Sequence, residues 1–334
     1  MGDKTGIGWT EATWNPIVGC SIVSAGCTNC YAMKQAGRIE RMSAGAGTQT
    51  HYAGTTKPSK AGDVWTGVMN RAPEHLRFQP LAWKRPRVIF VNSMSDLFHE
   101  SVPQDWIDEA FAVMALSPQH TFQVLTKRAA RMRYYLSHPG TGLRISGKIG
   151  RVSGEHKIPF DRMAEVACRW PLPNVWLGVS AEDQRAADER IPDLLETPAA
   201  IRFVSYEPAI GAIDFEKIAE SRTREINSLG GWVTAQVDGD VVVGPTEKLD
   251  WIIIGGESHS LRTKAREFNV AWAMDTVRDC RAAGVAVFVK QLGSRPVYVG
   301  EAGKGDVAIT HRKGETMSEW PLSIRVQQYP AGAR

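Results

Sequence analysis

Three cysteines, Cys20, Cys27 and Cys30, lie within one window of eleven residues. Thiolates ligate zinc and iron–sulfur clusters, and a structural zinc ion normally takes four ligands from the protein. No fourth cysteine or histidine lies near these three in the sequence. The trio therefore predicts a metal or iron–sulfur centre with one coordination position left open, as a catalytic centre requires.

The composition indicates an ordinary globular protein. Hydrophobic residues make up 43% of the 334 residues and charged residues 23%, which excludes a disordered chain, a collagen and a disulfide scaffold. The first ten residues hold no apolar signal segment, and no run of about 18 apolar residues could cross a membrane. We therefore expect a cytoplasmic protein with no membrane partner.

The remaining cysteines and the net charge set further limits. In a reducing compartment, clustered cysteines are more often metal ligands or catalytic groups than disulfides. Cys168 and Cys280 stand alone in the sequence and are expected to be small packing residues. The formal net charge of +4 permits a nucleic-acid partner without requiring one.

From residue 87 onward, short runs of β-branched and aromatic residues alternate with stretches of helical apolar spacing. Nearly continuous apolar runs are typical of parallel strands buried on both faces. We predict an α/β fold, a complete or partial TIM-type (β/α) barrel, with a doubly wound open sheet as the alternative. The predicted strands are 13–18, 87–92, 121–126, 175–180, 201–205, 250–254 and 286–290, and the predicted helices are 103–116, 128–136, 184–195 and 267–283.

The predicted barrel covers residues 1–294, with loop insertions near 44–80, 138–170 and 221–249. The last insertion contains a predicted β-hairpin around Asp238 and Gly239, because Asp-Gly favours a two-residue turn. Residues 295–334 lack the βα repeat and are predicted to form a short, hairpin-rich C-terminal appendage.

Polar residues follow nearly every predicted strand. Ligands bind at the carboxyl ends of the strands in barrels and in open α/β sheets alike. Each polar residue could instead cap a helix, but six segments that bring polar groups to one rim favour an active site. Gly255 and Gly256 would let the backbone approach a ligand closely. The sequence has no dinucleotide-binding or phosphate-loop motif.

The cysteine loop, which ends Cys27-Thr28-Asn29-Cys30-Tyr31, resembles the cluster loop of the radical S-adenosylmethionine (SAM) superfamily, particularly its photoproduct-lyase-like branch. Five further motifs, at 13–16, 90–98, 205–208, 255–257 and 289–292, resemble a family of phage-encoded, radical-SAM-like proteins of unknown activity. The similarity spans nearly the whole chain.

This resemblance implies a [4Fe–4S] cluster on Cys20, Cys27 and Cys30, whose fourth iron binds the amino and carboxylate groups of SAM. Reduction of the cluster would cleave SAM to a 5′-deoxyadenosyl radical, with a nucleic acid or nucleotide as the expected substrate and a separate electron donor as a partner. Two features depart from the superfamily. Six residues, rather than three, separate the first two cysteines, and Asn29 replaces the usual aromatic residue before the third.

By position in the barrel, the resemblance also assigns cofactor contacts and catalytic candidates. The methionyl end of SAM would lie near 93–96, and the ribose, adenine or substrate near the later strands. The predicted cofactor-binding residues are Tyr31, Ser93, Ser95, Asp96, Ser180, Glu182, Ser205, Glu207, Gly255 and Gly256. The catalytic candidates are Glu207, Lys127 and Lys290, although the two lysines could simply pair with neighbouring acids.

Two alternatives remain open. The protein could be a non-catalytic, metal-binding nucleic-acid-binding protein in which the trio and a histidine such as His99 hold zinc, or a radical SAM enzyme that acts on a peptide or metabolite. For a nucleic-acid substrate, we expect a long basic loop at the mouth of the barrel to follow the phosphate backbone. The basic residues of that loop are Arg144, Lys148, Arg151 and Lys157.

Overall fold

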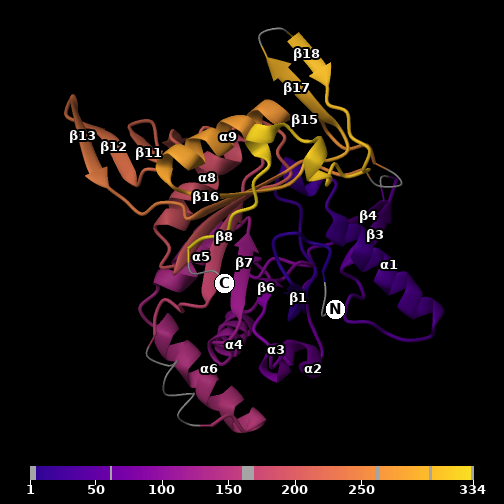
Figure 1. Ribbon diagram of the computed structural model, residues 1–334. Helices are drawn as coiled ribbons and strands as arrows, with labels where there is room; N and C mark the ends of the chain where they lie inside the picture. The colour runs from indigo at the N-terminus through magenta and orange to yellow at the C-terminus, as the bar shows by residue number, and fades with distance from the viewer. Residues whose placement is uncertain (1–4, 61, 160–168, 260–262, 301–302, 332–334) are drawn as a thin grey trace. The chain divides into compact units, whose positions relative to one another are not determined.

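Figure 1 presents the computed structural model, which describes residues 5–60, 62–159, 169–259, 263–300 and 303–331. The chain divides into two units. The first unit comprises Met1–Val23, Cys30–Leu177 and Thr197–Ala200, and the second comprises Ser24–Asn29, Gly178–Glu196 and Ile201–Arg334.

In the first unit, β1 (Ala12–Trp14) pairs in parallel with β6 (Val88–Val91), and β6 pairs in parallel with β7 (Thr121–Thr126). β8 (Val175–Ser180), of which the residues up to Leu177 belong to this unit, follows β7 in the sheet. Every residue of β6 and β8 is buried, as expected of strands covered on both faces. The helices α4 (Gln104–Ala115) and α5 (Ala129–Ser137) follow β6 and β7, which makes two βα units.

In the second unit, β14 (Trp251–Gly255) pairs in parallel with both β9 (Ile201–Tyr206) and β16 (Ala286–Gln291). Helix α8 (Gln184–Leu195) precedes β9, and α9 (Val270–Ala283) precedes β16. Asp183 caps α8 by accepting a hydrogen bond from Ala186 N at 2.9 Å. The predicted strands and helices of this half are therefore confirmed, except that Phe268–Asn269 form a strand, β15, and the helix predicted at 267–283 begins only at Val270.

The seven strands of the main sheet follow the order β1-β6-β7-β8-β9-β14-β16, which is also their order along the chain. In a doubly wound sheet the order of the strands reverses at a switch point. No such reversal occurs among the described strands, so the alternative prediction of a doubly wound open sheet is wrong. The α/β class and the parallel sheet are confirmed. Among the described residues, β1 and β16 are not paired with each other, and a closed barrel is not shown.

The 44–80 insertion is built from short elements. Strands β3 (Thr56–Ser59) and β4 (Gly62–Trp65) form an antiparallel pair that packs on α1 (Tyr31–Gly45). Strand β5 (Asn70–Arg71) pairs with β2 (Ile17–Val18), and α2 (Glu74–Arg77) and α3 (Gln79–Ala82) follow. The predicted single strand at 13–18 is thus divided into β1 and β2.

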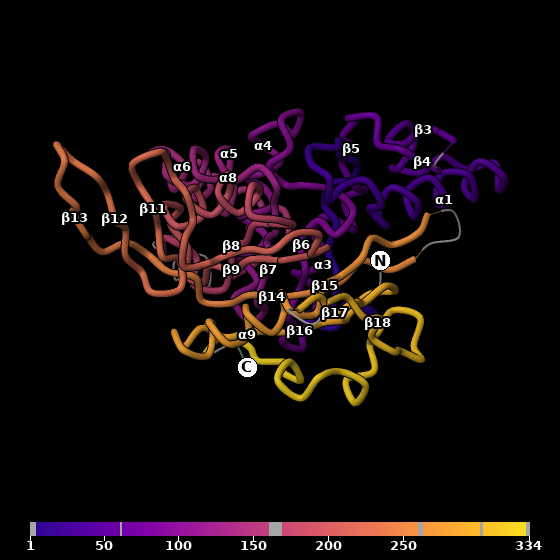
Figure 2. Tube along the Cα trace, turned by 90° about the horizontal axis from the view of Figure 1, so that it is seen from above, coloured from indigo at the N-terminus to yellow at the C-terminus, as the bar shows by residue number. Residues whose placement is uncertain are grey.

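The 221–249 insertion belongs to a four-stranded antiparallel sheet of β10 (Ile218–Ala219), β11 (Arg224–Asn227), β12 (Trp232–Val237) and β13 (Asp240–Pro245). Figures 1 and 2 both show β12 and β13 extending away from β16 (Ala286–Gln291). Asp238 and Gly239 have φ of 51° and 90° at the turn, the positive values that a type I′ turn needs. The predicted hairpin is confirmed.

The C-terminal region contains the antiparallel pair β17 (Pro296–Gly300) and β18 (Gly303–Asp306), beside β15 (Phe268–Asn269). Two 3₁₀ turns follow, at Met317–Glu319 and Leu322–Ile324. Val289 N then donates to Val326 O, and Gln328 N donates to Val287 O, both at 2.9 Å. The end of the chain therefore hydrogen-bonds to β16, while the predicted boundary at 294 stays a prediction.

The prediction of a long basic loop in the 138–170 insertion is wrong. The segment with the basic residues forms a helix, α6 (Thr141–His156). This helix packs against α4 and buries Ile145, Ile149 and Val152. It lies in the connection from α5 back to β8, whereas the segments that border a barrel's active mouth leave the carboxyl ends of strands.

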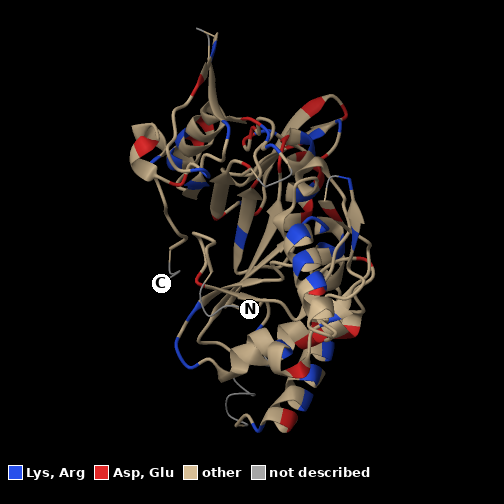
Figure 3. Ribbon diagram, turned by 90° about the vertical axis from the view of Figure 1, so that its right-hand side faces the viewer, with Lys and Arg blue, Asp and Glu red and all other residues tan. Residues whose placement is uncertain are grey.

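The basic residues of α6 also have acidic partners in the chain. Arg144 Nε lies 3.4 Å from Asp108 Oδ2, Lys148 pairs with Asp105, and Arg151 Nε lies 3.1 Å from Glu155 Oε1. Figure 3 likewise shows basic and acidic residues interspersed on the helices. Because these basic side chains form ion pairs with acidic side chains of the same chain, they give little support to a phosphate-binding surface.

Two other expectations concern cysteines and membranes. Cys280 is fully buried in α9 and is the packing residue that was predicted, whereas Cys168 lies outside the described residues. None of the helices in the described ranges has the length and apolar character that crossing a membrane demands.

Candidate functional site

The backbone that presents Cys20 is held on both sides. Gly19 forms a parallel β-bridge with Ser95, and Gly67 N donates to Cys20 O at 3.1 Å. Gly19 has a φ of +100°, and a Cβ atom there would lie 2.1 Å from Val68 O. Glycine is therefore required at the position that leads into Cys20.

We expect Gly19→Ala to lower the free energy of unfolding by roughly 2–4 kcal/mol, because a positive φ and a backbone clash both destabilise. The matched control is Gly147→Ala in α6, where a Cβ meets nothing within 4 Å. It should raise the free energy of unfolding by about 0.5–1 kcal/mol through its higher helix propensity. Urea unfolding followed by circular dichroism measures both; equal effects would contradict the assignment.

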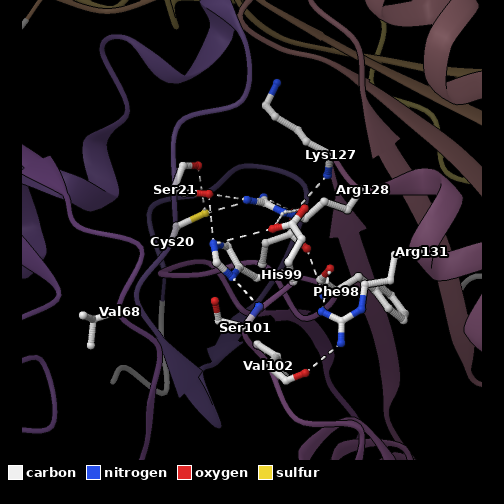
Figure 4. A network of polar contacts seen from close by, with 12 residues as sticks. Cys20, Ser21, Val68, Phe98, His99, Ser101, Val102, Lys127, Arg128 and Arg131 are labelled. Carbon is white, nitrogen blue, oxygen red and sulfur yellow. Dashed lines mark hydrogen bonds and ion pairs between the residues drawn. The ribbon is translucent and has the colours of Figure 1, made fainter.

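A buried guanidinium group lies beside the Cys20 thiol (Figure 4). Arg128 Nη1 lies 3.8 Å from Cys20 Sγ, and Arg128 Nη2 donates to Ser21 Oγ at 2.7 Å. Arg128 Nε also contacts Glu100 at 3.1 Å. The pKa of the Cys20 thiol is raised to about 12, chiefly by burial and also by Asp96, against the opposing effect of Arg128. A free thiol is thus protonated at neutral pH, and binding a metal would displace its proton.

Asp96 holds Arg128 in this position. Its Oδ1 accepts hydrogen bonds from Thr126 Oγ1 at 2.7 Å and Phe98 N at 3.0 Å. Its Oδ2 accepts from Lys127 N at 3.0 Å and from Arg128 Nη1 at 3.1 Å. The carboxylate predicted to face the cofactor is therefore engaged by four donors of the chain itself. The Lys127 side chain points away from this network in Figure 4.

His99 belongs to the same network and is 3% exposed. Its Nδ1 accepts from Ser101 N at 3.1 Å, and its Nε2 lies 2.9 Å from Ser21 Oγ. Burial and Arg128 lower the pKa of His99, so the ring is neutral, with Nε2 as the donor. Because both ring nitrogens are hydrogen-bonded, His99 is a poor candidate for the fourth ligand of a zinc ion.

Cys30 immediately precedes α1 and packs, like Cys20, against one group of buried residues in the first unit. That group is Val18, Ala32, Met33, Ala36, Tyr52, Trp65 and Met94. The three predicted cofactor-binding residues nearby make internal contacts: Tyr31 OH donates to Ser93 O at 2.8 Å, Ser93 Oγ donates to Asn15 Oδ1 at 3.2 Å, and Ser95 Oγ donates to Ile17 O at 2.7 Å.

Cys27 lies in the segment Ser24–Asn29, which belongs to the second unit. Its Sγ is 3.8 Å from Ser24 Oγ. Glu182, a predicted cofactor-binding residue, instead accepts from Gly26 N at 3.2 Å and pairs with Arg190 Nη1 at 3.1 Å. Both of these charged side chains are almost fully buried. Glu182 is therefore an anchor of the cysteine segment.

A second anchor of this segment is an ion pair. Arg266 Nη2 and Nε lie 2.6 and 3.1 Å from the two carboxylate oxygens of Glu257, and Asn29 Nδ2 donates to Glu257 Oε2 at 3.0 Å. Burial alone would raise the pKa of Glu257, but the hydrogen bonds from Arg266 and Asn29 lower it overall. The carboxylate is thus ionised at neutral pH.

The catalytic candidates Glu207 and Lys290 meet at the carboxyl ends of β9 and β16. Lys290 Nζ donates to Glu207 Oε2 at 2.9 Å, while the buried Oε1 has no hydrogen-bond partner within the described ranges. A Cβ on Gly255 would lie 2.5 Å from that Oε1, so glycine leaves the room that the carboxylate occupies. At Gly256 the close approach is to Leu292 O, which is the chain's own backbone and not a ligand.

The remaining predicted residues, Ser180 and Ser205, both belong to the second unit and lie on the adjacent strands β8 and β9, and Ala181 N donates to Ser205 O at 3.0 Å. Sequence reasoning missed Arg190 and Arg266, and it gave Glu257 no role of its own. Glu182 and Glu257, which pair with these arginines, both follow strands, and that position was the only signal in the sequence that they belong to the site. The arginines themselves carry no motif.

The donor set of the three cysteines suits a metal or iron–sulfur centre, because none of the three forms a disulfide and all three residues are partly exposed. The part of the chain that the structure describes contains no group of three His, Cys, Asp or Glu side chains gathered closely enough to hold a metal ion. The assignment of the three cysteines as metal ligands therefore depends on their residue type and on the surroundings of each one.

Comparison with known proteins gives one match. The family model described as a protein of unknown function (DUF5131) matches residues 4–321. No curated protein and no solved structure matches the chain. The match brings no named activity, so the function has to be argued from the residues.

Proposed function

The chain belongs to the family described as protein of unknown function (DUF5131), and from its cysteine trio we propose that it is a radical SAM enzyme. In this proposal Cys20, Cys27 and Cys30 hold a [4Fe–4S] cluster with one iron open to SAM. When bound, that cluster supplies the electron that cleaves SAM and so starts hydrogen-atom abstraction from a substrate.

The observation that carries the proposal is the cysteine trio at the start of a parallel α/β sheet. Cys20 follows β1 and β2, the first strands in the described residues, and none of the three cysteines forms a disulfide. Cys20 and Cys30 also pack against the same buried group in the first unit. A structural zinc site would need a fourth ligand, and the histidine proposed for that role has both ring nitrogens hydrogen-bonded.

The surrounding side chains support this chemistry. The Arg128 guanidinium beside Cys20 Sγ favours a thiolate ligand over a thiol, and hydrogen bonds to ligand sulfurs tune the reduction potential of iron–sulfur clusters. Glu207 Oε1, which has no partner in the described ranges, would accept a hydrogen bond from a hydroxyl or amino group of the cofactor or substrate. Lys290 Nζ donates to the other carboxylate oxygen, Oε2, at 2.9 Å and so holds the group in place.

The scaffold and the substrate are part of the same proposal. The sequential order of parallel strands supports a partial TIM-type barrel, in which the carboxyl ends of the strands carry the site. We propose a nucleic acid or nucleotide as the substrate, with an electron donor as a second partner. The support for this substrate class is the positive net charge of +4.

Anaerobic reconstitution tests the proposal. After incubation with iron, sulfide and a reductant, the protein should contain about four iron atoms per chain and should form 5′-deoxyadenosine from SAM. Adding single-stranded DNA, RNA, a mononucleotide mixture or a peptide mixture should then increase that rate for the correct substrate class. Bound zinc without iron would overturn the enzyme assignment, and stimulation by the peptide alone would overturn the substrate class.

A further inference from the structure

The segment Ser24–Asn29 is fastened along its length by side chains from distant parts of the second unit. Arg266 Nη1 donates to Ala25 O at 2.8 Å, Gly26 N donates to Glu182 Oε1 at 3.2 Å, and Asn29 Nδ2 donates to Glu257 Oε2 at 3.0 Å. Contacts thus precede and follow Cys27. We call this set of contacts the Cys27 clamp.

The centre of the clamp is the pair of Glu257 and Arg266. Arg266 binds the carboxylate through Nη2, Nε and its own backbone N, at 2.6, 3.1 and 2.9 Å. The Glu257 side chain is only 8% exposed. An arginine that grips a carboxylate with two parallel hydrogen bonds has a fixed plane, so Nη1 is aimed at Ala25 O by the same interaction.

The clamp holds the segment on both sides of Cys27. Ala25 and Gly26 lie within the six residues that separate Cys20 from Cys27, and Asn29 immediately precedes Cys30. A longer loop has more conformations to lose when it closes on a ligand. Fixing it beforehand reduces that cost.

We infer that Glu257 and Arg266 are positioning residues that hold Cys27 in place for ligation. Outer partners of this kind commonly control the metal affinity of a site by fixing the orientation of its ligands. The inference rests on the proposed function for the identity of the ligand, but the clamp itself is a property of the metal-free chain.

The test is the rate at which iodoacetamide alkylates Cys27 in the full-length, metal-free protein, measured by peptide mass spectrometry. Glu257→Ala and Arg266→Ala should each accelerate alkylation of Cys27 at least about fivefold, because each removes a charge-assisted hydrogen bond. The rate at buried Cys280 should not change. Lys304→Ala, which removes an exposed pair with Glu267 in the same unit, is the control and should leave Cys27 unaffected.

Milder variants decide the matter if an alanine variant unfolds and exposes Cys280. Asn29→Ala removes one hydrogen bond, and Arg266→Lys keeps the charge while losing the two-pronged grip. Both should accelerate Cys27 alkylation while Cys280 stays protected. After reconstitution, the same variants should bind less iron and show an altered electron paramagnetic resonance signal.

Unchanged Cys27 alkylation in all four clamp variants would overturn the inference. That outcome is distinct from failure of the proposed function. If the wild-type chain bound no iron, the alkylation rates would still report whether Glu257 and Arg266 hold Cys27.

Discussion

Replacing Cys20, Cys27 or Cys30 by alanine, one at a time, should abolish the iron–sulfur cluster and the formation of 5′-deoxyadenosine from SAM. With one iron left open to SAM, each of the other three irons needs one thiolate, so each substitution leaves an iron without its protein ligand. The outcome is measured as iron and sulfide content and as the visible absorbance of the cluster. Chromatography detects 5′-deoxyadenosine.

The matched control for these variants is Cys280→Ala. Cys280 is buried in α9, and its loss should lower stability by about 1 kcal/mol through the small cavity it leaves. Iron content should stay at the wild-type value. Full iron and sulfide content in Cys27→Ala would contradict the assignment of the trio.

Arg128→Ala should lower the free energy of unfolding by roughly 3–5 kcal/mol, because it leaves the Asp96 carboxylate buried without its charged partner. The side chains of Arg128 and Asp96 are 5% and 7% exposed. Urea denaturation of the metal-free protein measures the effect apart from any role of Arg128 in catalysis.

The control is Arg278→Ala, since Arg278 also faces two acids, Asp275 and Asp279, but its side chain is 67% exposed. It should change the free energy of unfolding by only about 0–1 kcal/mol. The double variant Asp96→Asn with Arg128→Met should cost less than Arg128→Ala, because no uncompensated charge remains. Equal losses for Arg128→Ala and Arg278→Ala would show that burial of the pair has no energetic consequence.

The strands and most helices could be predicted because their signals are local. The run Thr121–Thr126 is nearly continuous in apolar and β-branched residues, and it forms β7 with those bounds. The prediction of a loop where α6 lies failed because four glycines punctuate that stretch. The contrary signal was the helical spacing of Ile145, Ile149 and Val152, whose burial against α4 outweighs the poor helix propensity.

For the candidate site, the sequence could predict only which polar residues follow strands and so lie at the same edge of the sheet. Asp96 and Arg128 follow adjacent strands, so their contact agrees with the expectation of a polar rim. The sequence could not predict that Asp96 binds Arg128 rather than a cofactor, because it does not show which donors will hydrogen-bond to a given carboxylate. Arg266 was missed for a simpler reason: it meets Ala25 across 241 residues of sequence.

The long sequence separations in the Cys27 clamp have a consequence for biosynthesis. Glu182, Glu257 and Arg266 follow the residues they hold by 156, 228 and 241 positions. At ribosomal rates of about 5–20 residues per second, Arg266 is synthesised on the order of 10–50 s after Ala25. Cys27 therefore leaves the ribosome long before its anchors exist, and under the proposed function stable metal insertion at this residue would follow the synthesis of most of the chain. A nascent chain interrupted before Glu182 would carry all three thiols and none of the side chains that hold the segment around Cys27.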